Sequence, residues 1–387
     1  MEGDPLSPLL FILAMEVLHA VLCKALQVIL FEGVKVGNDL VHVSQLMYAD
    51  DVIFMGEWSL QNATNLIGLL RCFYVTSGLK IIVRKSNIMG VGVDQREAEN
   101  LAAILGCGVA ALPFTYLGVP VGCNMSRVKY WKPVVEKFKT KVSSWKARSL
   151  SVGGRLTLIK AVLENLPVYF MSLYKLSMAI IKTLEGMRIK FFIGGDLDEK
   201  KMTWVAWKKC LASKMFGGLG IGSIFALNRG LLFKWIWRFR VSPDELWAKV
   251  NRSIYGVNGG IDVVAGDRLP SSTWGGIIKA LRDLVDKGVN LVAGCIRKIE
   301  DGNSISFWHD VWYGDSPLKV RFDNIYRLEL EKGCVVLVRD RADSEVCGDV
   351  LRRSPRDGVE AAQLSAVRDL MVEVRFSEKK DGLSWFF

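Results

Sequence analysis

Two adjacent aspartates, Asp50 and Asp51, are the clearest candidates for chemistry in this sequence. They stand between two apolar runs, residues 45–48 and 52–55, which predict a tight β-hairpin with both acids at its tip. Neighbouring carboxylates repel each other unless a cation lies between them, and Mg²⁺ prefers carboxylate and phosphate oxygens. Aspartate is also a favoured turn residue, so a solvated turn is the alternative interpretation.

The sequence around this hairpin predicts an α+β segment. Ser7 followed by Pro8 is typical of a helix start, with Ser7 as the cap, and the apolar run that follows predicts a mostly buried helix to about Lys24. The other expected elements are strands over 34–38, 41–48 and 52–56, a helix over 60–76 closed by Gly78, extended chain over 79–93, and a pair of short strands within 114–122.

The excess of positive charge lies in the middle of the chain. Residues 126–252 hold 25 basic and 8 acidic side chains, whereas residues 1–125 hold 7 and 11. From Pro133 the apolar residues recur with a period of 3.6, which predicts helices over about 133–148, 152–166, 177–193 and 223–240. Ten of the basic side chains fall within 126–160, against Glu136 alone. A solvated lysine face and a polyanion-binding face are both compatible with this pattern.

Beyond Gly256 the pattern is mixed. The triplet Asp301-Gly302-Asn303 predicts a hairpin that joins strands over 296–299 and 304–308. We therefore expect three domains, over residues 1–125, 126–255 and 256–387, of which the second is all-helical. The glycines between 217 and 222 favour an interhelical turn over a phosphate-binding loop.

The composition narrows the class of protein. Of 387 residues, 50% are hydrophobic and 24% are charged, which excludes a disordered tail. The longest apolar stretch, residues 8–22, is interrupted by Glu16 and His19, so we expect no membrane span and no membrane partner. The first residues lack the positive charge of a signal peptide. Eight cysteines without a C-x-x-C pair predict buried thiols in a reducing, intracellular compartment, and with three histidines we expect no zinc site.

The tetrapeptide YADD, residues 48–51, resembles the catalytic hairpin of reverse transcriptases when it lies between two apolar strands, as it does here. Further segments resemble, in the same order, parts of the polyproteins of plant LINE-type, non-LTR retrotransposons. These segments are GDPLSPLLF (3–11), SGLKIIVRKS (77–86), FTYLGVPVG (114–122), WKARSLSVGGRLTLIKAVL (145–163), FGGLGI (216–221), FKWIWRF (233–239) and DGNSISFWHDVW (301–312). The resemblance covers nearly the whole chain.

The resemblance implies part of a reverse-transcriptase palm, then a helical thumb-like domain, then a mixed segment that leads into a zinc-binding-type region. It implies an RNA-directed DNA polymerase of the nucleus or cytoplasm that uses Mg²⁺ or Mn²⁺, dNTPs, an RNA template and a DNA primer. The implied catalytic residues are Asp50, Asp51 and Lys85, with the two aspartates as metal ligands. The implied nucleotide and template contacts are Gly3, Asp4, Pro5, Tyr48 and Ala49, the implied primer grip is Tyr116, Leu117 and Gly118, and the expected nucleic-acid contacts are Lys129, Lys132, Lys137, Lys139, Lys141, Lys146, Arg148 and Arg155.

One departure from the family bears on catalysis. The family takes a third, necessary aspartate from a strand before the GDPLSP loop, and here only Met1 and Glu2 precede Gly3. We therefore expect both ends of the chain to be cut and the isolated chain to be catalytically incomplete. A non-catalytic nucleic-acid-binding protein is the second hypothesis. A group II intron-type maturase is the third, and the segment over 145–163 argues against it.

Overall fold

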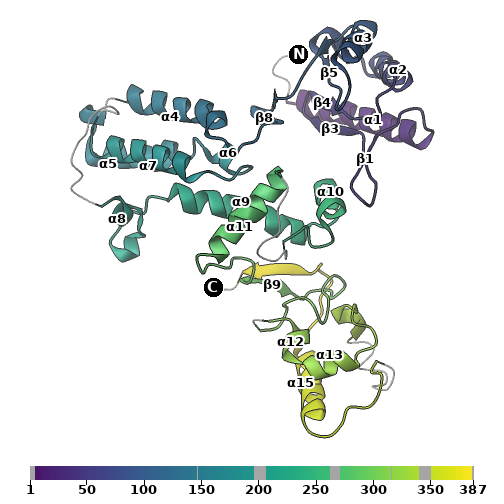
Figure 1. Cartoon of the computed structure of the whole chain (residues 1–387), viewed down its shortest axis with the longest axis vertical. Coiled ribbons are helices and arrows are strands. Elements are labelled where there is room, and N and C mark those ends of the chain that lie inside the picture. Colours follow the sequence, from purple (N-terminus) through teal and green to yellow (C-terminus); the bar gives the residue numbers. More distant parts are fainter. Residues whose placement is uncertain are drawn as a thin grey trace. The chain divides into compact units, whose positions relative to one another are not determined.

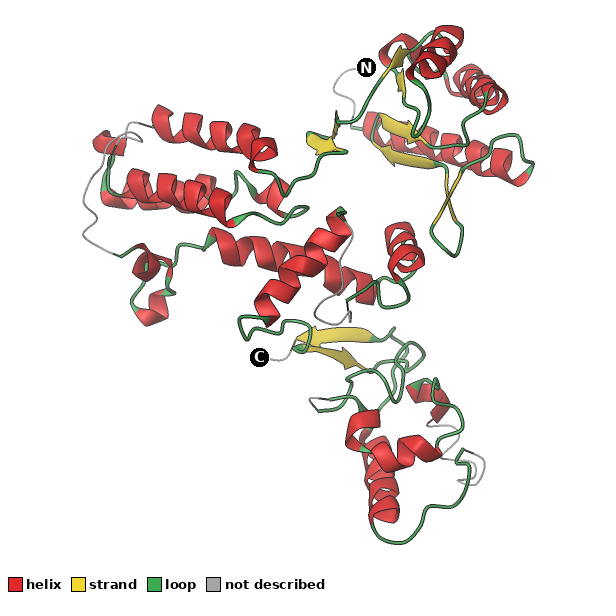
Figure 2. Ribbon diagram, in the orientation of Figure 1, coloured by secondary structure: helices red, strands yellow, loops and turns green. Residues whose placement is uncertain are grey.

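Figures 1 and 2 show a computed structural model of the chain, which describes residues 5–145, 147–195, 206–261, 271–314, 316–339 and 350–385. The predicted α+β class is confirmed. Every sheet within these ranges has two strands. Backbone contacts group the chain into two compact units: residues 1–133 with 244–268, and residues 134–243 with 269–387.

The first unit begins with a long helix and two hairpins. Pro8 lies in the first turn of the opening helix, where its missing N–H costs no hydrogen bond, but Leu6 and not Ser7 occupies the cap position. Ser44 separates two strands where a single strand over 41–48 was predicted. The elements are α1 (Ser7–Gln27), β1 (Val34–Val36), β2 (Val41–Val43), β3 (Gln45–Tyr48), β4 (Asp51–Phe54) and α2 (Leu60–Ser77).

The rest of this unit differs more from the prediction. The stretch predicted as extended contains η1 (Val83–Lys85) and β5 (Asn87–Ile88). Helix α3 (Gln95–Leu105) was not predicted, although Asp94 caps it and Gly106 ends it with a left-handed φ of 74°. It connects β5 to β6 (Gly108–Val109), which pair in parallel. The predicted pair of short strands is confirmed as β7 (Phe114–Tyr116) and β8 (Val119–Val121), which are antiparallel.

One face of α1 is buried and the other is open. Leu18, Leu22 and Ala25 pack with Phe31 and Phe73 in the core of this unit. The opposite face carries Leu9, Leu10 and Leu13, which are 58%, 61% and 63% exposed. The prediction of a mostly buried helix is therefore wrong, because α2 and the hairpins cover only one side of α1 among the described residues.

Helix α1 also bears on the question of a membrane span. It has 21 residues, more than the interrupted apolar stretch suggested, and it is the one described helix long and apolar enough to cross a bilayer. The helix is therefore not too short to cross a bilayer, contrary to the prediction from the sequence. Core helices and signal sequences have the same length and composition, so these features alone do not assign α1 to a membrane.

Helix α10 (Leu246–Tyr255) belongs to the first unit. The Ser253 hydroxyl accepts a hydrogen bond from the Asp39 N–H (2.7 Å), and the Ser253 carbonyl accepts one from the Asn38 N–H (3.0 Å). These bonds attach α10 to the turn between β1 and β2. This grouping differs from the predicted boundary at residue 255, and the division into three domains stays a prediction.

The second unit is helical from α4 to α9, as predicted, and it continues with α11, which was not predicted. The four predicted helices are confirmed with small shifts at their ends, and Pro167 separates two of them. The elements, which follow η2 (Val128–Trp131), are α4 (Lys132–Ser144), η3 (Ala147–Ser149), α5 (Val152–Leu158) with the π-helical turn η4 (Ile159–Leu163), α6 (Val168–Met171), α7 (Met178–Phe192), α8 (Trp207–Leu211), η5 (Lys214–Phe216), α9 (Ile224–Val241) and α11 (Thr273–Val285).

The C-terminal part does not contain the predicted hairpin. Strand β9 (Cys295–Lys298) pairs with β10 (Gly382–Trp385) instead of with residues 304–308. The reason is Asp381, whose carboxylate accepts hydrogen bonds from the N–H groups of Glu300 and Gly302 (both 2.8 Å) and folds the loop around itself. Helices α12 (Leu318–Arg321), α13 (Asp323–Leu328) and α15 (Val359–Glu373) complete this part.

Four cysteines show how far the thiol prediction holds. Cys210, Cys295 and Cys334 are buried, whereas Cys72 is exposed on α2. Burial raises the pKa of Cys334 to about 11, so its thiol stays protonated at neutral pH. The prediction of buried thiols is correct for these three residues and wrong for Cys72.

Candidate active site and nucleic-acid interface

The β3–β4 hairpin holds both aspartates at its tip, as predicted. Tyr48 pairs with Asp51, which leaves Ala49 and Asp50 as a two-residue turn. Ala49 has φ of 50°, a conformation that is uncommon for a residue with a side chain. Met47 packs toward the core of the unit, so Tyr48 and Asp51 lie on the other face of the hairpin. Asp50 and Asp51 are both exposed.

A buried amide fixes the base of this hairpin. The Asn62 side chain accepts a hydrogen bond from the Glu32 N–H (2.8 Å) and donates to the carbonyls of Glu32 (2.9 Å) and Glu57 (3.0 Å). Beside it, Gly33 and Gly56 form an isolated β-bridge. A Cβ on Gly56 would lie 2.8 Å from the Glu32 carbonyl, so the two segments approach too closely for a larger residue. These contacts fix the position of the end of the hairpin that lies opposite Asp50 and Asp51.

The residues expected to grip the primer form their own hairpin. Leu117 (φ 47°) and Gly118 (φ 77°) make a two-residue turn with both φ angles positive, the type I′ geometry that joins β7 and β8. Burial raises the pKa of Tyr116, and the carboxylate of Asp51 raises it further. Tyr116, a residue of the implied primer grip, therefore lies near Asp51, an implied catalytic residue.

The remaining residues predicted for the catalytic centre are not gathered in the same way. Pro5 is exposed at the start of the described chain, and Gly3 and Asp4 lie outside the described residues. Lys85 is exposed in η1, and no ion pair with Asp50 or Asp51 occurs in the part of the chain that the structure describes. Its implied role stays a prediction.

The described residues do not make a complete metal site. Asp50 and Asp51 supply the oxygen ligands that Mg²⁺ and Mn²⁺ prefer. However, no group of three or more His, Cys, Asp or Glu side chains that could hold a metal occurs among the described residues. Two-metal phosphoryl transfer needs ligands for two ions a few ångströms apart, so this pair does not fit that requirement alone.

The candidate nucleic-acid interface is the exposed side of α4, here called the α4 basic surface. Val134, Phe138 and Val142 are buried on one side of the helix. The α4 basic surface comprises Lys132, Lys137, Lys139 and Lys141, which are all exposed and flank the buried side.

The other predicted basic contacts have different surroundings. Lys129 is exposed in η2 and lies 4.8 Å from the centre of the Tyr130 ring. Arg148 is exposed in η3, and Lys146 lies outside the described residues. Arg155 is half-buried and donates a hydrogen bond to the Ala147 carbonyl (3.1 Å). Its guanidinium therefore connects two helical segments, and a phosphate contact by Arg155 stays a prediction.

Sequence reasoning missed a buried ionic cluster in the second unit. Arg188 is fully buried in α7 and donates to Glu185 (3.0 Å), Glu164 (3.1 Å) and the Gly222 carbonyl (3.0 Å). Burial lowers the pKa of Arg188, and the two glutamates raise it. Only the Glu185–Arg188 spacing on one helix gives a signal in the sequence. The other partners are 24 and 34 residues away along the chain.

Comparison with known proteins gives a coarse assignment. No protein-family model matches the chain. It is 35% identical over 195 residues to the Arabidopsis thaliana protein "Putative ribonuclease H protein At1g65750", over 49% of this chain and 30% of that protein. It is 32% identical over 155 residues to "Uncharacterized mitochondrial protein AtMg00310" of the same plant, over 40% of this chain and 96% of that protein.

These relatives are of a kind typical of retrotransposon-derived open reading frames, so the chain is retrotransposon-related. More closely, the chain belongs to the same family as the uncharacterized mitochondrial protein, which it covers almost end to end. The similarity to the first relative spans less than a third of that longer protein.

Proposed function

We propose that the chain descends from the reverse transcriptase of a LINE-type retroelement and binds nucleic-acid duplex through the α4 basic surface. The observation that carries the binding proposal is the set of four exposed lysines that flank the buried face of α4. The YADD hairpin and the retrotransposon-related relatives support the lineage. In this proposal residues 1–125 are part of a palm and residues 126–255 form a helical thumb-like region.

The chemistry of the α4 basic surface favours a phosphate backbone. Lysine ammonium groups bind phosphates as point charges and release condensed counterions, so affinity falls as salt rises. If four of these side chains touch phosphate, the log-log slope with salt is about −3.6 for B-form DNA. Phosphate contacts carry no sequence information, so we expect little sequence preference.

In this proposal the chain descends from a polymerase, but the isolated chain does not catalyse polymerisation. In polymerases of this class two metal ions activate the primer hydroxyl and hold the triphosphate. Asp50 and Asp51 would supply ligands to such ions, but a further carboxylate from outside the described residues is needed. The isolated chain is therefore proposed to bind primer and template without extending the primer.

The test is binding of the full chain to labelled DNA and RNA–DNA duplexes, measured by fluorescence anisotropy over a range of salt. Reversal of Lys137, Lys139 and Lys141 to Glu should weaken binding and flatten the salt slope by about 3 units, whereas Asp50→Asn should change neither.

A matched control variant distinguishes an effect of the α4 basic surface from an effect of the total charge of the chain. Reversal of Arg375, Lys379 and Lys380, which are exposed near the C-terminus, changes the net charge by the same amount. Equal losses from both triple variants would contradict the proposal, as would binding that does not depend on salt. Splicing of an intron RNA by the chain would instead favour the maturase hypothesis.

A further inference from the structure

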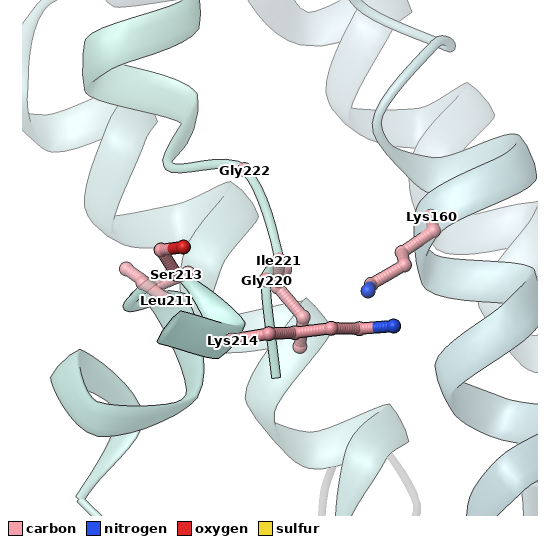
Figure 3. Close-up of a pocket in the computed structure, with 7 residues that line it drawn as sticks. All are labelled: Lys160, Leu211, Ser213, Lys214, Gly220, Ile221 and Gly222. Carbon is pink, nitrogen blue, oxygen red and sulfur yellow. The ribbon is translucent and has the colours of Figure 1, made fainter. Parts of the chain in front are cut away.

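An open pocket of about 470 Å³ lies in the second unit, away from α4 in the sequence (Figure 3). Two lysines from different elements line it, Lys160 on η4 and Lys214 on η5, and their side chains point toward each other. A Cβ on Gly220 would lie 3.6 Å from both Lys160 Nζ and Lys214 Cγ. Both lysines therefore lie beside the same stretch of backbone.

The pocket has an excess of positive charge. Lys160 donates a hydrogen bond to the Leu219 carbonyl (2.6 Å), which uses one of its three ammonium protons. Neither Lys160 nor Lys214 forms an ion pair with any carboxylate in the described ranges. The acid next to the pocket, Glu164, is already bonded to Arg188 and to the Gly222 N–H (2.7 Å). Two ammonium groups thus remain available to an anion.

The glycine loop beside the lysines does not bind phosphate through its backbone. The N–H groups of Gly218, Gly220 and Gly222 donate to Ser213, Ala212 and Glu164, at 3.1, 2.9 and 2.7 Å. The predicted interpretation as a turn is therefore correct, and recognition of an anion falls to the lysines. Arg188 donates a hydrogen bond to the Gly222 carbonyl at the end of this loop, and Lys160 donates one to the Leu219 carbonyl within it. Both bonds help to fix the position of the loop relative to Lys160.

An exposed aromatic ring two residues from Lys214 favours a nucleic-acid strand over a free phosphate as the ligand. Phe216, which follows Lys214 by two residues in η5, is 84% exposed. Proteins that bind single strands combine basic groups for the backbone with aromatic rings on which bases stack. A free phosphate would use the lysines and leave the ring without a role.

We propose that Lys160 and Lys214 bind a backbone phosphate of a nucleic-acid strand and that Phe216 stacks on a neighbouring base. This inference rests on the proposed function, because it adds a single-strand contact for a nucleic acid whose duplex part the α4 basic surface binds. It assigns single-stranded nucleic acid, such as the template beyond a duplex, to this pocket.

The test uses the full chain and a labelled single-stranded oligonucleotide. Phe216→Ala should lower affinity about tenfold, within the range for loss of one stacked base. Lys214→Gln should flatten the log-log salt slope by about 0.7, the value for one phosphate contact on a single strand. These two side chains are exposed, so the variants should keep the helical circular dichroism of the chain.

Lys208→Gln is the matched control, since Lys208 is an exposed lysine on α8 outside the pocket. Equal effects of Lys208→Gln and Lys214→Gln would overturn the proposal. It would also fail if inorganic phosphate at constant ionic strength displaced the oligonucleotide from Lys214 while Phe216→Ala had no effect, because the pocket would then be a phosphate site.

The two proposals can fail separately. If the α4 triple reversal weakens binding but the pocket variants do not, the pocket proposal is wrong and the proposed function stands. If the unaltered chain binds neither duplex nor single strand, both are wrong.

Discussion

Tyr116 of the β7–β8 hairpin lies close enough to Asp51 of the β3–β4 hairpin for the carboxylate to raise the pKa of the phenol. The two residues are 65 positions apart in the sequence, and they come from the two segments that the resemblance assigned to the catalytic hairpin and the primer grip. Their proximity links those segments within the first unit by an electrostatic interaction.

This relationship predicts a pKa shift. Asp51→Asn removes a negative charge that disfavours the tyrosinate, so the pKa of Tyr116 should fall toward its ordinary value near 10. Burial still raises the pKa in the variant. Titration of ¹³C-labelled tyrosine by NMR measures the shift, with Tyr116→Phe to assign the resonance. Asp50→Asn should have the smaller effect, and equal shifts from both variants would contradict the proximity of Asp51.

A second prediction concerns polymerisation. The isolated chain should give no RNA-templated primer extension with Mg²⁺ or Mn²⁺, because Asp50 and Asp51 alone do not hold two ions in line. Loss of a complete metal site costs many powers of ten in rate. Extension of a labelled primer, read on a denaturing gel, tests this. Extension that Asp50→Asn abolishes would show that the chain has a complete site.

Local signals in the sequence predicted much of this fold. The β3–β4 hairpin was predictable because apolar strands flank two turn residues, and the end of α2 because Gly78 closes the helix. The predicted hairpin at Asp301-Gly302-Asn303 failed for a different reason. The triplet is typical of a turn, but the carboxylate of Asp381, 77 or more residues further along the chain, accepts hydrogen bonds from the N–H groups of this loop. Such a long-range partner leaves no periodic signal.

The candidate sites also differ in whether local sequence patterns predict them. The α4 basic surface was predictable because a helix separates its buried and exposed positions by spacing alone. The pocket at Lys160 and Lys214 was not, because its two lysines come from elements about 50 residues apart that meet only in the folded chain. Arg188 was missed for the same reason, since two of its partners come from other elements.

The third prediction concerns the Arg188 cluster. Arg188→Met should cost about 3 kcal/mol or more of local stability, because Glu164 and Glu185 lose the charge that compensates them inside the unit. Hydrogen exchange of α7 and of the loop before α9 measures the loss. Lys182→Met, an exposed change on the same helix, should cost less than about 0.5 kcal/mol. Similar exchange in both variants would show that the cluster does not stabilise the loop.

The fourth prediction concerns acid pH. Burial raises the pKa of Asp381, but hydrogen bonds from the backbone of Glu300, Ser304 and Gly302 outweigh it, so the pKa lies below the ordinary 3.8. A lowered pKa in the folded chain means that the stabilisation is present above about pH 4 and is lost as pH falls through the lower value.

Hydrogen exchange of residues 300–304 against pH tests this, and the loop should open in that acid range. Asp381→Asn should loosen the loop already at neutral pH, whereas Asp369→Asn, an exposed change on α15, should not. A loop that stays protected in Asp381→Asn would rule out the carboxylate as its organiser.

The last prediction concerns the open face of α1. Leu10 and Leu13 are more than 60% exposed, whereas Leu18 and Leu22 on the other face are fully buried. A continuous exposed apolar face favours self-association. The double variant Leu10→Glu, Leu13→Glu should therefore reduce association in sedimentation velocity and leave the hydrogen exchange of α2 unchanged. Leu18→Glu should instead unfold the first unit, because it places a charge in the core. If the double variant also unfolded this unit, the outer face of α1 would be covered in the folded chain.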